Sequence, residues 1–262
     1  MAMPKTTRPH DLTLVMAGAE ERLQLVLGQP GLGGLTLLAS RQWTVPGQSV
    51  RFLMPGLKSV LDEFGLDTSV LKRIACVRGP GSFTGLRLVL AAAEGVAAGL
   101  HLPLAGLDYL PLLAAGPGPL LTGPLHVLTY ARRGLVYMQS FRCPDLDVIA
   151  PLDALTLEQA GQRMADIGPE AHLMGTGLRK NPAFFEDFFE AEPGYAPLDA
   201  AFDNPAPERL LAAADQAAFS GESIEPIYVR PSDAEANLDQ IAAKRGLDPD
   251  EARRKLEALS RA

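Results

Sequence analysis

The chain has 262 residues, of which 47% are hydrophobic and 21% are charged, as expected for one large globular domain or two modest ones. Its net charge of −7 argues against a broad basic surface that holds nucleic acid unaided, although a partner could supply positive charge. No apolar run approaches the ~20 residues that span a bilayer. Residues 1–10 are polar, so we expect a disordered leader and a cytoplasmic protein without membrane contact.

The first elements are three short apolar runs separated by small or polar residues, which predict an antiparallel meander over residues 12–15, 23–27 and 35–39. Residues 49–64 then carry apolar side chains at helical spacing, and Gly65 is a C-terminal stop signal. The apolar run 74–77 predicts the next strand. It contains Cys76, which, like Cys143, we expect to be reduced and buried.

The most informative stretch is GPGSFTGLR at residues 79–87, which lies between that strand and a long Ala-rich segment. The order predicts a strand, a glycine-rich turn and a helix. Such a turn presents free N–H groups, so one hypothesis is a nucleotide or anion site formed by Gly79, Gly81, Ser82, Thr84 and Gly85. The alternative is a tight connection in which Ser82 or Thr84 caps the helix. The stretch has neither a Walker lysine nor the glycine spacing of dinucleotide-binding proteins.

The predicted helix over residues 84–99 has a core-facing apolar stripe and a second line of mostly small residues, namely Leu88, Ala92, Gly95 and Gly99. A glycine inside a helix costs about 1 kcal/mol relative to alanine. Two glycines on one line therefore suggest that another backbone approaches closely. This neighbour could be part of the same domain or a second subunit.

The Gly- and Pro-rich residues 116–124 indicate a boundary or loop. The remaining elements predicted from apolar patterning and capping signals are a hairpin of strands 125–130 and 135–141 with a basic tip, a helix over 153–164, a strand over 172–175, an irregular covering segment over 181–197, a strand over 226–229, and polar helices over 233–244 and 249–260. The sequence shows no internal repeat.

The chain shows no credible catalytic constellation. Its four histidines include no pair three to five residues apart, so a helical metal-binding pair is absent. No Gly-x-Ser-x-Gly elbow occurs, and the acidic residues are scattered or lie in helix-capping positions. We therefore expect no catalytic residues, no metal and no cofactor.

The glycine turn resembles the signature of the TsaB family, also called YeaZ, whose members take part in forming threonylcarbamoyladenosine on tRNA. Three further segments resemble elements of that family in the same order: the helix at 49–65, the hairpin ARRGLVY at 131–137, and the closing PIYVR at 226–230. The resemblance spans residues 49–231, and the glycine turn is its most specific part.

The resemblance implies an α/β, actin-like (ASKHA, ribonuclease-H-like) fold of two lobes. We expect an N-terminal lobe over residues 11–108, a second lobe over 109–231 whose last strand can return to the first, and a helical tail over 232–262. It also implies a non-catalytic subunit that partners the paralogue TsaD, with the ATPase TsaE joining and tRNA contacted only through the complex. In the family, helices around the signature bind TsaD or a second TsaB copy, which matches the line of small residues.

Two departures from the family pattern bear on chemistry. The first strand of the family ends in Asp-Thr-Ser, whereas the corresponding stretch of this chain is Val15-Met16-Ala17-Gly18-Ala19, and the aspartate before Ala-Arg-Arg is Tyr130. The loss of the first acid argues against nucleotide hydrolysis. The alternatives are an active ASKHA-type phosphotransferase or glycoprotease-like enzyme, which the glycine turn would suit, and a homodimeric binding protein.

Overall fold

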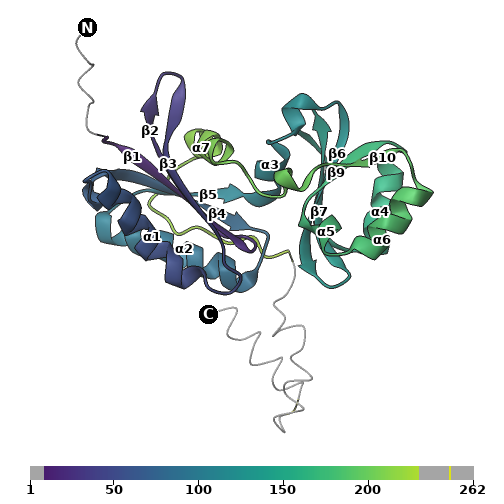
Figure 1. Ribbon diagram of the computed structural model, residues 1–262, viewed down its shortest axis with the longest axis horizontal. Coiled ribbons are helices and arrows are strands. Elements are labelled where there is room, and N and C mark those ends of the chain that lie inside the picture. The colour runs from purple at the N-terminus through teal and green to yellow at the C-terminus, as the bar shows by residue number, and fades with distance from the viewer. Residues whose placement is uncertain (1–8, 230–247, 249–262) are drawn as a thin grey trace. The chain divides into compact units, whose positions relative to one another are not determined.

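The computed structural model describes residues 9–229 and Asp248, and the residues up to Ile227 form one compact unit with two five-stranded sheets (Figure 1). Most of the predicted leader and both predicted tail helices lie outside the described residues. The first sheet has the order β3-β2-β1-β4-β5 and consists of β1 (Leu12–Ala17), β2 (Arg22–Gly31), β3 (Gly34–Thr44), β4 (Leu71–Gly79) and β5 (Leu104–Asp108). The second has the order β10-β9-β6-β7-β8 and consists of β6 (Gly123–Arg132), β7 (Leu135–Cys143), β8 (Asp147–Thr156), β9 (Ala171–Met174) and β10 (Tyr195–Pro197).

The two sheets have the same topology. In the first, β1, β2 and β3 form an antiparallel meander, and β4 and β5 add parallel strands beside β1. In the second, β6, β7 and β8 form the meander, and β9 and β10 add parallel strands beside β6. The α/β, two-lobe prediction is therefore confirmed, and the duplication lies in strand order although the sequence shows no repeat.

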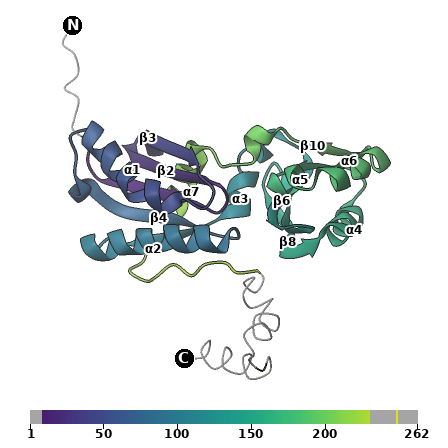
Figure 2. The same ribbon diagram turned by 60° about the horizontal axis from the view of Figure 1, so that its bottom comes forward.

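Helices cover both faces of the first sheet (Figure 2). One face packs against α1 (Ser49–Glu63) and α2 (Phe83–Leu100), and the other packs against α3 (Tyr109–Ala114) and α7 (Pro207–Gln216). Alternation along the strands makes this possible, because successive side chains point to opposite faces. In β1, Leu14 and Met16 join the α1–α2 core, whereas Val15 joins the core on the other face.

In the second sheet, one face is covered by α4 (Leu157–Ile167), α5 (Thr176–Arg179) and α6 (Pro182–Ala191). We call the first sheet with α1, α2 and α7 the first lobe, and the second sheet with α4, α5 and α6 the second lobe. Within residues 9–229 there are also three short 3-10 helices, Thr68–Val70, Gly118–Leu120 and Ala200–Phe202.

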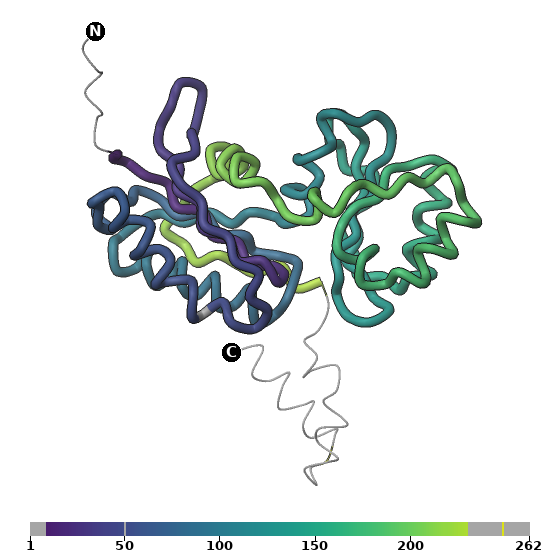
Figure 3. Tube along the Cα trace, viewed as in Figure 1, coloured from purple at the N-terminus to yellow at the C-terminus, as the bar shows by residue number. Residues whose placement is uncertain are grey.

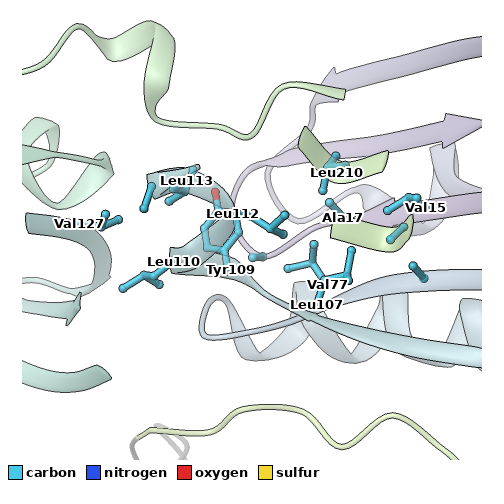
Figure 4. Packing of buried hydrophobic residues seen from close by; sticks show 14 of the residues in the cluster. Val15, Ala17, Val77, Leu107, Tyr109, Leu110, Leu112, Leu113, Val127 and Leu210 are labelled. Carbon is cyan, nitrogen blue, oxygen red and sulfur yellow. The ribbon is translucent and has the colours of Figure 1, made fainter. Parts of the chain in front are cut away.

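One hydrophobic core joins the two lobes through α3 (Figure 4). Val77 and Leu107 contribute from the first sheet, and Val127 contributes from the second. Between them lie the buried side chains of Leu110 and Leu113 on α3. The lobes are thus connected by shared apolar packing as well as by the chain.

After the second lobe the chain returns to the first. Helix α7 packs against β3, β1, β2 and β5, and the following segment up to Ile227 runs along α2 (Figure 3). In this segment the backbone N–H of Ile224 donates to Glu94 Oε1 on α2 at 3.2 Å. The predicted lobe boundaries at residues 108 and 231 stay predictions as domain limits.

Several local predictions are confirmed. The meander, the helix from Ser49, the strand before the glycine turn, the helix after it, the hairpin with Gly134 at its tip and the strand near residue 172 are all present. Gly65, just past α1, has a φ of 62°, which suits the expected stop. Cys76 and Cys143 are free thiols and both are buried, as expected.

The helix predicted over 153–164 begins later, at Leu157. Asp153 to Thr156 continue β8, because they pair with β7 from Met138 to Leu135. Thr156 then caps α4 in a capping box with Gln159, which the apolar pattern alone did not reveal.

Two other predictions are wrong. The covering segment 181–197 is largely helical, because Pro182 occupies the first turn of α6, where its missing N–H costs nothing, and Phe185 packs into the core of the second lobe. Residues 226–229 form no strand. Ile227 donates one backbone hydrogen bond to the Arg78 carbonyl at 2.8 Å, and no ladder follows.

Candidate functional site

The glycine turn is closely packed against the turn between β1 and β2. A Cβ on Gly81 would lie 2.1 Å from the carbonyl oxygen of Ala19, and one on Gly85 would lie 2.8 Å from that of Gly18. Gly79 has a φ of 116°, a conformation that favours glycine. The glycines are therefore required by close approach of the protein's own backbone and by local conformation.

The hydroxyl cap of α2 is Ser82, whose Oγ accepts from the backbone N–H of Gly85 at 3.3 Å. The Ser82 N–H donates to the Ala19 carbonyl, so this group of the turn is already paired within the protein. Thr84 is exposed at the start of the helix. A nucleotide or anion site formed by these residues stays a prediction.

Of the line of small residues on α2, the two glycines face away from the core, whereas Ala92 packs against it. Leu88 and Ala92 are partly buried, and Gly95 and Gly99 are exposed. A Cβ on either glycine would meet no atom within 4 Å, so among the described residues no backbone of the same chain approaches there. The explanation by packing within the domain is thus wrong for the two glycines. The subunit interface stays a prediction.

Helix α2 is also the one helix among the described residues that is long and apolar enough, by length and composition, to cross a membrane. Core helices of globular proteins meet the same criterion. The buried residues of α2 in the first lobe are Leu86, Val89, Leu90, Ala93 and Ala97.

A polar cluster that the sequence analysis missed lies where the two lobes meet. Glu20, in the β1–β2 turn, accepts from the Tyr109 hydroxyl at 3.0 Å and from the Thr176 hydroxyl. Burial raises the pKa of Glu20 from 4.5 to about 7, against the lowering effect of both hydrogen bonds and of Lys180. Asp203 lies nearby and is held by the Gly175 N–H and by Arg179.

No sequence signal pointed to this cluster, because its members come from four separate segments and only tertiary packing brings them together. Residues 15–19 and Tyr130, which correspond to the stretches where the family pattern has acids, contribute no carboxylate. Ala17 is buried in the core that joins the lobes, and Tyr130 supplies its backbone N–H to Thr176 Oγ1 at 3.0 Å.

A cavity of about 460 Å³ lies between β5, α3 and α7. Its walls are mostly Ala, Leu and Pro side chains, and its polar groups are Arg78, Asp108, Arg209 and Gln216. Arg78 donates to Asp108 at 2.7 Å. Across the described residues, no three His, Cys, Asp or Glu side chains lie close enough to hold a metal ion.

Comparisons with known proteins point to one family. A family model described as "TsaD: tRNA N6-adenosine threonylcarbamoyltransferase" matches residues 47–154, which include the glycine turn and α2. The "tRNA threonylcarbamoyladenosine biosynthesis protein TsaB" of Escherichia coli is 28% identical over 71% of this chain and 82% of that protein. The protein of the same name from Bacillus subtilis is 26% identical over 78% of this chain and 91% of that protein.

Among solved structures, "YeaZ from Pseudomonas aeruginosa" superposes with a TM-score of 0.61 at 23% identity, over 83% of this chain and 99% of that one. This likeness supports the predicted actin-like arrangement of two α/β lobes, and the fold prediction is confirmed. The sequence relatives and the structural likeness agree with the glycine signature quoted above. The chain is therefore similar in sequence and in fold to TsaB (YeaZ) proteins.

Proposed function

We propose that this protein is a non-catalytic subunit in the formation of threonylcarbamoyladenosine on the adenosine next to the anticodon of tRNA, and that it acts by binding a TsaD paralogue. The names of the E. coli and B. subtilis relatives support the pathway. The open face of α2 supports the binding role, and it is the observation on which the proposal chiefly rests.

The α2 face suits a helix of a partner. Two exposed glycines on one line each cost about 1 kcal/mol relative to alanine, and within the described chain nothing uses the space they leave. Helices approach most closely where the contacting side chains are small. Leu88, partly buried at one end of the line, would supply apolar contact area.

The residue types in the inter-lobe region support a non-catalytic role. Residues 15–19 and Tyr130 offer no carboxylate where the family pattern has acids. The nearby Glu20 carboxyl is engaged by Tyr109 and Thr176 instead. The proposal further includes a TsaE ATPase as a third component, tRNA contact only through the complex, a cytoplasmic location without membrane contact, and a homodimer in which α2 meets a second copy.

Depletion of the protein in its own cells tests the pathway. We expect the threonylcarbamoyladenosine content of total tRNA, measured by mass spectrometry, to fall, and a plasmid copy of the gene to restore it. An unchanged nucleoside content after depletion would overturn the proposal. ATP turnover by the purified protein that is lost on Gly85→Ala would instead support the phosphotransferase alternative.

A further inference from the structure

Besides the shared apolar core, the two lobes are connected by one carboxyl group that has a hydroxyl donor on each oxygen. Glu20 Oε2 accepts from Tyr109, the first residue of α3, and Glu20 Oε1 accepts from Thr176, the first residue of α5. The β1–β2 turn of the first lobe is thereby bonded to the second lobe. We call the three side chains of Glu20, Tyr109 and Thr176 the Glu20 clasp.

The Thr176 hydroxyl can hydrogen-bond to Glu20 in either protonation state, because it has one proton to donate and a second lone pair that can accept from a protonated carboxyl group. Thr176 Oγ1 accepts the backbone N–H of Tyr130 at 3.0 Å, so its own proton is available to Glu20. A second contact lies beside it, because Lys180 at the end of α5 forms an ion pair with Glu21 and lies 5.0 Å from the Tyr130 ring. Glu21 and Lys180 are both exposed, so this outer pair contributes little.

We propose that the Glu20 clasp is a proton-sensitive contact between the lobes, which is closed when Glu20 carries a proton and loosened when Glu20 is ionised. The geometry supplies the contact, since the single carboxyl group bonds elements of both lobes. The geometry also makes the contact sensitive to pH, because the carboxyl group is buried only while the β1–β2 turn contacts α3 and α5. Separating them would expose it to water.

The direction follows from the surroundings of Glu20. Burial raises its pKa to about 7, more than the hydrogen bonds from Thr176 and Tyr109 and the charge of Lys180 lower it. Asp203, beyond α5 in the chain, adds to the rise, and Arg179 holds that second carboxylate. Burial raises the pKa of Tyr109 well above 10.0, and the positive charge of Arg22 on β2 partly opposes this rise.

An exposed glutamate has a pKa near 4.5, the value from which burial raises Glu20. The closed state therefore binds the proton more tightly than the open state, and by linkage a rise in pH between 4.5 and 7 favours opening. A folded-state pKa near 7 corresponds to a change of at least about tenfold in the ratio of open to closed molecules, because each pKa unit is a factor of ten. The ratio of open to closed molecules levels off about one pH unit above 7, once the closed state is also ionised.

Single-molecule fluorescence energy transfer tests the proposal on the full chain. Donor and acceptor dyes would be placed on exposed positions of the two lobes, with Gln42→Cys on β3 and Glu186→Cys on α6, since the native thiols are buried. The wild-type ratio of open to closed molecules should rise at least about tenfold from pH 5 to pH 8. Glu20→Gln should show a constant ratio, and the matched control Glu21→Gln should follow the wild type.

A constant wild-type ratio, or a rise that persists in Glu20→Gln, would overturn the proposal. A carboxyl-carbon NMR titration of Glu20 keeps the test decisive if Glu20→Gln folds poorly. Its midpoint in the wild type should match the fluorescence midpoint. It should rise in Thr176→Val, because that variant loses a hydrogen bond that lowers the pKa. An ordinary glutamate midpoint near 4.5 would contradict the proposal.

Discussion

The backbone N–H of Ser82 donates to the carbonyl oxygen of Ala19, with 2.6 Å between nitrogen and oxygen. This bond joins the family's glycine signature to the β1–β2 turn. The same oxygen lies 2.1 Å from the place where a Cβ on Gly81 would stand. The signature is thereby explained as a packing requirement that fixes where α2 begins, before any ligand is invoked.

Gly81→Ala should destabilise the protein by about 2 kcal/mol or more, because the added Cβ meets backbone that cannot rotate away. Gly95→Ala is the matched control, since its Cβ meets nothing and alanine stabilises an exposed helix interior by about 1 kcal/mol. Urea denaturation of both variants gives the two free energies. Equal effects in the two variants would show that the Gly81 contact is unimportant.

Glu20→Gln should change how stability depends on pH. The folded-state pKa of Glu20 is raised to about 7, so the stability that its proton provides is complete below pH 4.5 and is lost as pH rises to 7. The free energy of unfolding of Glu20→Gln, relative to wild type, should therefore increase between pH 4.5 and 7 by up to about 3 kcal/mol. Partial exposure of the side chain reduces this figure. A difference that does not vary with pH would contradict the expectation.

His126 should make the protein sensitive to acid. It is fully buried on β6, its Nδ1 is 2.8 Å from Ser140 Oγ, and burial lowers its pKa from 6.5 to about 4. The stability that neutral His126 provides is therefore complete above pH 6.5. As pH falls to 4, the free energy of unfolding decreases by about 3 kcal/mol in total. The double variant His126→Leu/Ser140→Ala removes both partners, which limits the polar cost.

With rising pH, the titration of Glu20 lowers the free energy of unfolding and that of His126 raises it. Because their pH ranges overlap, the two effects partly cancel in the wild type. Denaturation between pH 4.5 and 6.5 should show stability rising with pH in Glu20→Gln, where the titration of Glu20 no longer opposes that of His126. In the double variant stability should fall with pH. A Glu20→Gln protein whose stability is level over this range would show that His126 does not titrate as expected.

Local signals in the sequence were sufficient for most of the first lobe. The alternation before residue 44, the helical spacing after Ser49 and the Gly-rich signature each depend on neighbours in the chain, and the structure bears them out. The prediction of secondary structure failed where contacts between distant parts of the chain determine it. Asp153 extends a strand because β7 pairs with it, and Pro182 begins a helix because Phe185 is buried beneath it.

The candidate site was predicted only in part. The α2 line could be read from one periodic segment, and the structure shows Gly95 and Gly99 to be open. The Glu20 clasp could not be predicted from the sequence, because a glutamate in a turn is ordinarily solvated and no neighbouring residue distinguishes this one. Its partners Tyr109 and Thr176 lie 89 and 156 residues away.

Binding of the purified TsaD paralogue to three forms of this chain, measured by calorimetry, tests the proposed role most directly. Gly95→Leu places a bulky side chain on the α2 line, and the matched control Gly221→Leu places one at another exposed glycine whose Cβ would meet nothing. We expect wild type and Gly221→Leu to bind alike. Gly95→Leu should bind at least about tenfold more weakly through overpacking, although its own melting temperature is unchanged or higher. Undiminished binding by Gly95→Leu, or no binding by the wild type, would contradict an α2 interface.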